Sequence, residues 1–119
     1  MSIQKFEDVI AWQKSQNFAV DIYSSFKECK DWDFRNQICR AVVSISNNIA
    51  EGFDRSSRKE FRRFLIISLA SCSEVKSMLM LARRLEYLEE PKSETMIFQS
   101  IEISKIINRL IKSLKITDT

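Results

Sequence analysis

Apolar side chains recur at intervals of three and four along most of the chain, which is the spacing that places them on one side of an α-helix. The repeat divides into four stretches, at about residues 7–28, 33–52, 57–87 and 93–115. The repeating positions are Val9, Trp12, Ala19, Tyr23 and Phe26, then Phe34, Ile38, Val42, Ile45 and Ile49, then Phe61, Leu65, Cys72, Val75 and Leu79, and finally Ile103, Ile107, Leu110 and Leu114. The pattern predicts four helices.

Residues at the ends of these stretches are typical of helix termini. Asp33 is expected to cap the second helix, and Gly52, the single glycine, to end it in the left-handed conformation. Ser57 and Glu60 have the spacing of a capping box, in which each side chain bonds the other residue's backbone amide. The short connections make sequential helices neighbours, so we expect an antiparallel up-and-down four-helix bundle in one domain, residues 1–119.

The composition agrees with an all-α fold, because one glycine and one proline in 119 residues leave little material for hairpin turns. The chain has three widely spaced cysteines, Cys29, Cys39 and Cys72. Their odd number and wide spacing are typical of reduced thiols in a cytoplasmic protein. The N-terminal stretch carries acids rather than a signal-peptide core, and the longest apolar run, residues 64–72, falls short of the roughly 20 residues that a membrane span needs. A cytoplasmic location without membrane contact is expected.

The second and third helices carry more apolar surface than one bundle face can bury. The additional positions are Cys39, Val43 and Ala50 in the second helix and Ile67, Met78, Leu81 and Leu85 in the third. In so small a protein, a helix that is apolar nearly all round is best explained by contact with another chain, which predicts a homo-oligomer. The alternative is a monomeric bundle with a few exposed apolar side chains, which is common in soluble proteins.

A polar strip runs between the two apolar faces of the second helix. Its members are Gln37, Arg40, Ser44, Asn48 and Glu51, three or four residues apart, and Glu74 of the third helix lies within the second apolar row there. We expect Glu74 to be partly shielded from solvent, and Arg40 to contact Glu51 or Glu74 and so to fix the register of the helices. The alternative is a catalytic carboxylate pair, but neither a nucleophile nor a metal ligand accompanies Glu51 and Glu74.

The residues that most enzymes depend on are missing from the chain. There is no histidine, which removes the commonest general base and zinc ligand. With one glycine, a glycine-rich phosphate loop cannot be built, and no G-x-S-x-G motif occurs. We therefore expect a protein without catalytic residues, cofactor or metal.

Five cations lie within nine residues where the third helix begins. They are Arg55, Arg58, Lys59, Arg62 and Arg63, and they outnumber Asp54 and Glu60 although the formal net charge is only +3. Cations at a helix N-terminus oppose the helix dipole, so helix stability does not explain them. Three interpretations stay open: a solvated face, a sequence-tolerant site for RNA or DNA, and a contact with an acidic protein. A narrow sector of the third helix also holds Arg58, Arg62, Lys76 and Arg83, and no aromatic residue alternates with these cations as base stacking would require.

Several of these segments resemble one family. They are Trp12-Gln13-Lys14, Gln37-Ile38 with Arg40-Ala41, Ser44-Ile45, Asn48-Ile49-Ala50-Glu51-Gly52, Ser57 with Glu60-Phe61, and Ser71 with Glu74. Over about residues 6–88 the chain resembles the bacterial four-helix-bundle proteins encoded in intervening sequences of 23S rRNA genes. One difference is KECKDWD, where that family usually has a proline between the first two helices.

That family is similar to the accessory variability determinant proteins of diversity-generating retroelements, which form pentameric barrels that bind a reverse transcriptase and nucleic acid. The resemblance implies a homopentameric bundle with an RNA-linked role and no established enzyme activity. It leaves a second possibility open, a scaffold or accessory subunit that binds another protein such as a reverse transcriptase.

Overall fold

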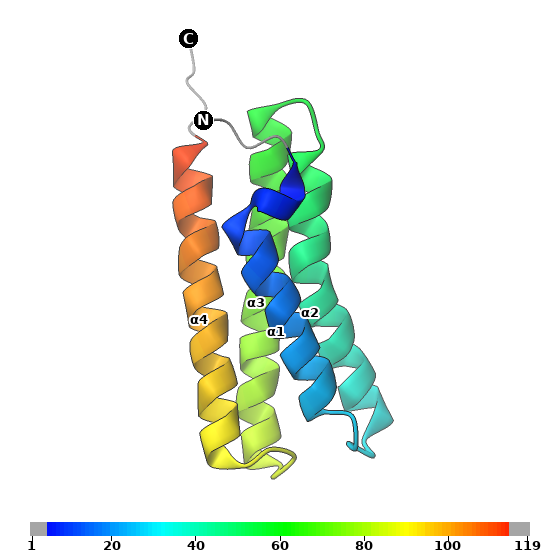
Figure 1. The fold of residues 1–119 in the computed structure, drawn as a ribbon. Helices are drawn as coiled ribbons and strands as arrows, with labels where there is room; N and C mark the ends of the chain where they lie inside the picture. The colour runs from blue at the N-terminus through cyan, green and yellow to red at the C-terminus, as the bar shows by residue number, and fades with distance from the viewer. Residues whose placement is uncertain (1–4, 115–119) are drawn as a thin grey trace.

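The computed structural model describes residues 5–114, which form an antiparallel four-helix bundle (Figure 1). A short 3₁₀ turn, η1 (Phe6–Asp8), precedes the helices α1 (Ile10–Ser25), α2 (Trp32–Phe53), α3 (Arg58–Arg84) and α4 (Glu90–Ser113). Helix α1 packs against α2 and α4, and α3 also packs against α2 and α4, so α1 and α3 lie diagonally across the bundle. The predicted all-α fold and helix order are confirmed, with the helix ends shifted by several residues.

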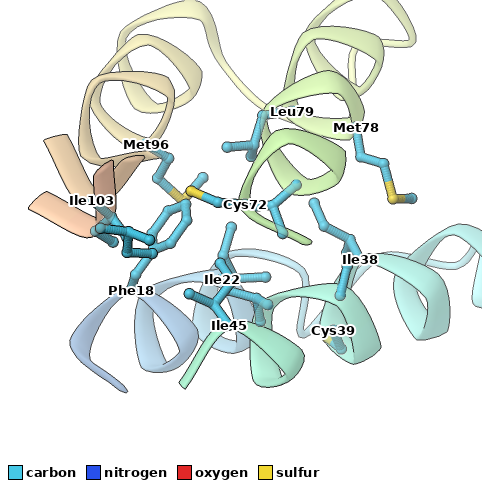
Figure 2. Packing of buried hydrophobic residues seen from close by; sticks show 14 of the residues in the cluster. Phe18, Ile22, Ile38, Cys39, Ile45, Cys72, Met78, Leu79, Met96 and Ile103 are labelled. Atoms are coloured by element: carbon cyan, nitrogen blue, oxygen red, sulfur yellow. The ribbon is translucent and has the colours of Figure 1, made fainter. Parts of the chain in front are cut away.

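Side chains from all four helices meet in one apolar interior, part of which Figure 2 shows. The predicted core positions of α2 are confirmed, since Phe34, Ile38, Val42, Ile45 and Ile49 are all buried. The predicted stripe of α1 is partly wrong. Tyr23 is 51% exposed, and the row that faces the core is Ala11, Ser15, Phe18 and Ile22. Ser15 is tolerated there because its hydroxyl donates to the Ala11 carbonyl at 2.7 Å.

The caps of α2 and α3 agree with the sequence only in part. Asp31, not Asp33, caps α2, because the Asp31 carboxylate accepts the Phe34 amide at 3.2 Å. The expected cap of α3 is confirmed by the Ser57 hydroxyl, which accepts the Glu60 amide at 3.1 Å. The reciprocal half of the capping box does not form in the described structure, since the Glu60 carboxylate instead binds Arg63.

Gly52 does not end its helix in the left-handed conformation. No described glycine has a positive φ, and α2 continues through Gly52 to Phe53. Gly52 is buried against α3, where a Cβ atom would lie 2.5 Å from the Cβ of Phe64. The residue is a glycine because it lets two helix backbones approach closely.

Helix α3 ends earlier than expected, at Arg84 rather than near Tyr87. The chain turns through Glu86, which has a φ of 62°, while the Tyr87 amide donates to the Ala82 carbonyl at 2.8 Å. This is the Schellman arrangement, here built without glycine. Helix α4 begins at Glu90, slightly before its expected start, and its expected end at residue 115 lies outside the described residues.

Within the described residues, α3 is the one helix long and apolar enough to cross a membrane by length and composition, which the sequence analysis did not anticipate. A core helix of a bundle meets the same criteria. Leu65, Cys72, Val75 and Leu79 of α3 are fully buried between the neighbouring helices, so the fold itself accounts for the apolar character.

Candidate nucleic-acid interface

Two of the five predicted cations have acidic partners. Arg55 lies 3.2 Å from Glu51 and Arg63 lies 3.2 Å from Glu60. The guanidinium carbons of both arginines also lie 5.0 Å from the centroid of the Phe64 ring. The hydrogen bond from Arg63, followed by its charge, lowers the pKa of the Glu60 carboxyl. Arg55 and Arg63 therefore hold the turn between α2 and α3, and their charges are largely compensated.

The other three predicted cations, Arg58, Lys59 and Arg62, are exposed in the first two turns of α3. None of them forms an ion pair with a residue that the structure describes. Their charges are thus available to an external anion, whereas those of Arg55 and Arg63 are shared with Glu51 and Glu60.

Helix α4 brings three further cations alongside the first half of α3. Because α3 and α4 are antiparallel, the last turns of α4 lie beside the first turns of α3 (Figure 1). The Ser104 hydroxyl bonds the Cys72 sulfur at 3.3 Å, which sets the register between these two helices. Lys105, Arg109 and Lys112 follow from there toward the start of α3, with no acidic residue from 105 to 114.

Together these residues form a surface that we call the basic face. It comprises Arg58, Lys59, Arg62 and Lys76 of α3 and Lys105, Arg109 and Lys112 of α4, and none forms an ion pair within residues 5–114. The α4 members were not predicted from the sequence, because their place beside α3 depends on the register between the two helices. A sequence signal did exist: Lys105 and Lys112 are seven residues apart in an acid-free stretch, which places them on one side of a helix.

The basic face does not include Arg83, the last member of the cation row expected along α3. Arg83 lies 3.2 Å from Glu90 and 4.0 Å from Glu94 of α4. This ion-pair network compensates the charge of Arg83 at the opposite end of the α3–α4 seam, whereas none of the cations of the basic face has such a partner among the described residues.

Most of the predicted polar strip lies along the α2–α3 seam. The Gln37 amide donates to the Glu74 carboxylate at 3.4 Å, and the Asn48 amide donates to the Ser44 carbonyl at 2.8 Å and to the Ser44 hydroxyl at 2.9 Å. Ser71, which was not among the predicted members of the strip, joins it because its hydroxyl lies 2.9 Å from that of Ser44. The Gln37–Glu74 and Ser44–Ser71 bonds link α2 to α3 at two levels.

The contact predicted for Arg40 does not form. Arg40 is exposed and pairs with neither Glu51 nor Glu74, and Glu51 binds Arg55 instead. Arg40 is three residues beyond Gln37, which turns it about 60° further from α3 around the helix. Glu74 is also exposed, contrary to expectation. The register of the two helices is therefore held by neutral hydrogen bonds and one amide–carboxylate bond.

The second apolar faces of α2 and α3 differ in how far the bundle covers them. Cys39 is buried, and Val43 and Ala50 are half-buried, so the single chain covers most of the α2 face. On α3, Met78 is buried, but three side chains remain exposed, which we call the outer row: Ile67 at 39%, Leu81 at 45% and Leu85 at 45%. The apolar surface that a second copy of the chain could cover therefore lies on α3 more than on α2.

Ionisable groups offer little for catalysis in the described part of the chain. No three histidine, cysteine, aspartate or glutamate side chains lie close enough together there to hold a metal ion. All three cysteines are free thiols, and burial raises the pKa of Cys72, which disfavours the reactive thiolate. Exposed cations are thus the main chemical feature of the described surface.

Comparisons with known proteins agree with the fold. The model of a family described as 23S rRNA-intervening sequence protein matches residues 7–109. A solved structure from Bacteroides thetaiotaomicron, a protein of unknown function from the S23 ribosomal protein family, is similar at 34% identity and a TM-score of 0.81. That match covers 87% of this chain and 99% of the other. A search of curated proteins found no significant match.

Proposed function

The chain belongs to the 23S rRNA-intervening sequence protein family, and we propose that it is a non-enzymatic, self-associating cytoplasmic protein that binds RNA or DNA through the basic face. The observation that carries this proposal is the charge of that face. Seven cations of two neighbouring helices extend over about 27 Å of α3, from Arg58 to Lys76, and none forms an ion pair with a described residue. Solvated surfaces normally intersperse both signs of charge.

The chemistry of these side chains favours binding without sequence preference. Lysine and arginine side chains on a convex helical surface reach phosphate oxygens, and phosphate contacts carry no direct sequence information. Each neutralised phosphate releases bound counterions, so the logarithm of the affinity falls with the logarithm of salt by about 0.9 per contact for duplex DNA and about 0.7 for single strands.

The proposal is tested by filter binding over a salt series with a charge-matched control. Replacing Arg58, Lys59 and Arg62 by glutamine should weaken the binding of every sequence and lower the salt slope by about two to three units. The control replaces Lys27, Lys30 and Lys92, three exposed lysines outside the basic face, and removes the same net charge. It should change the slope far less.

Two results would contradict the proposal. One is the absence of association between the unmutated protein and either RNA or DNA at about 50 mM salt, where phosphate contacts are strongest. The other is an equal loss of slope in both triple variants, which would mean that net charge alone, rather than the basic face, governs binding.

Self-association is the second part of the proposal, and the outer row supports it. The outer row is an exposed apolar surface beside the Gln37–Glu74 hydrogen bond, made by Ile67, Leu81 and Leu85. Another copy of the chain that packed against this surface would remove these side chains from water. The family resemblance implies a homopentamer. Several linked copies of the basic face would let individually weak phosphate contacts add.

A scaffold or accessory subunit for another protein, such as a reverse transcriptase, is the second candidate function. The outer row is also the observation that favours it, because a foreign chain can cover the same apolar side chains. An acidic protein partner would in addition fit the basic face. Failure of the protein to bind nucleic acid, together with a neighbouring reverse transcriptase gene, would favour this candidate.

A further inference from the structure

The α3–α4 seam continues beyond the basic face into an open cavity of about 480 Å³. Its lining is Met80, Arg83, Arg84, Glu94, Ile97, Phe98 and Ile101. The Phe98 side chain is 68% exposed and Met80 is 48% exposed, so neither is held in the core. An aromatic ring presented to solvent at the edge of an apolar cavity offers a flat surface against which a planar group can stack.

The ring and the cations lie in one row on α4. Phe98, Lys105 and Lys112 are seven residues apart, which places them on the same side of the helix about 10.5 Å from one to the next. Across the seam, Met80 lies at the cavity and Lys76 lies one turn closer to the cations. A ligand that follows the seam would meet positive charge first and the exposed ring afterwards.

The charges around the cavity do not repel an anion. Glu94 is the one carboxylate in its lining, and it lies 4.0 Å from Arg83, which also binds Glu90. Arg84 lines the same cavity and forms no ion pair with a described residue. Glu102, one turn beyond Phe98 on α4, is paired with Lys14 of α1 at 3.6 Å. The carboxylates of α4 nearest Phe98 are therefore each paired with a cation, which is compatible with a phosphate group nearby.

We propose that the α3–α4 seam binds an unpaired nucleic-acid strand, with its phosphates along Arg62, Lys105 and Lys112 and one base stacked on Phe98. This inference rests on the proposed function and specifies its ligand. In a duplex the bases already stack on one another, so only a single strand can offer a base to the ring. The structure thus supplies an aromatic residue that the sequence analysis did not associate with the cations, because Phe98 belongs to a different helix from the predicted cluster.

The test compares the stacking variant with a matched aromatic control by fluorescence anisotropy. The probes are a labelled oligothymidine of about 12 nucleotides, within the range that single-strand sites cover, and a labelled DNA duplex. Phe98→Leu should weaken binding of the single strand about 5- to 100-fold and leave its salt slope unchanged. Phe98→Tyr, which keeps a ring, should retain most of the affinity.

Trp32→Leu provides the control, because Trp32 is 69% exposed and lies on α2, which is diagonally across the bundle from α4 and does not contact it. Its replacement should not change binding of either probe. Lys105→Gln with Lys112→Gln should lower the single-strand slope by about 1.4, the sum expected for two phosphate contacts.

Each contrary result has a distinct meaning. Phe98→Leu could bind the single strand as tightly as the unmutated protein, while the triple glutamine variant at Arg58, Lys59 and Arg62 shows a smaller salt slope. In that case the proposed function stands and the stacking site is wrong. If the unmutated protein binds neither probe, both proposals are wrong. If Phe98→Leu lowers the mass measured by light scattering, the seam is a contact between copies, and the inference is overturned.

Discussion

Gly52 lies where α2 and α3 approach closely. Its replacement by alanine has two effects on stability of opposite sign, a gain in helix propensity and a loss from steric overlap. Alanine is favoured over glycine in a helix interior by about 1 kcal/mol. The new methyl group, however, would lie 2.5 Å from the Cβ of Phe64 and 3.1 Å from the Cδ1 of Phe61. The first of these atoms is fixed to the backbone of α3, so no side-chain rotation can remove the overlap.

The helices must therefore separate by about 1 Å to restore an ordinary contact between carbon atoms. Inserting a methyl group into a packed interior costs about 1 to 3 kcal/mol. After the gain in helix propensity, Gly52→Ala should lower the free energy of unfolding by about 1 kcal/mol, with a ceiling near 2. An ordinary helical glycine would give the opposite sign.

Urea unfolding followed by circular dichroism measures this change, and Asn47 provides the reference. Asn47 is exposed in the same helix, so the difference between Asn47→Gly and Asn47→Ala gives the propensity effect alone. If Gly52→Ala stabilises the protein by as much as that difference, the helices have room for a methyl group. The packing explanation for the glycine would then be refuted.

Two further predictions concern the outer row and the other end of the bundle. Light scattering at micromolar concentration should give several times the 14.0 kDa of one chain, and Leu81→Lys should reduce that mass without unfolding; a monomeric unmutated protein would contradict this. Tyr87 donates to the Asp31 carboxylate at 2.6 Å, and this bond, followed by that from the Phe34 amide, lowers the pKa of Asp31. This hydrogen bond stabilises the protein fully above pH 3.8, the ordinary pKa of an aspartate, and its contribution is lost as the pH falls through the lowered pKa of Asp31. Tyr87→Phe should therefore lower the melting temperature at pH 7 but not at pH values below that lowered pKa. Thermal melts from acid to neutral pH test this, and a uniform difference would argue against the linkage.

The periodicity of apolar residues predicted the buried positions best in helices where those residues have large side chains. In α2 the row from Phe34 to Ile49 is buried as expected. In α1 the periodicity misled, because the small residues Ala11 and Ser15 are buried while the larger Tyr23 is exposed. A small residue at an interface leaves a weak sequence pattern, since its burial depends on how closely the neighbouring helix approaches.

The candidate site was predictable only as far as its cations are close in sequence. The five cations near the start of α3 are visible in the sequence, but which of them are compensated depends on side-chain positions: Arg55 reaches Glu51, whereas Arg58 reaches no described acid. The contribution of Lys105 required the pairing of α3 with α4. For the same reason Arg40 was misplaced, because a difference of about 60° around α2 decides whether its side chain meets α3.

The two proposed surfaces can operate together because most of the basic face lies on a different side of α3 from the outer row. Ile67 of the outer row and Lys76 of the basic face are nine residues apart, which is half a turn around the helix. Copies joined through the outer row would therefore keep their basic faces open. A long strand could then engage several copies and a short strand only one, so the salt slope should grow with probe length up to the span of the assembly. A slope that does not depend on probe length would mean that each copy binds alone, whatever mass light scattering reports.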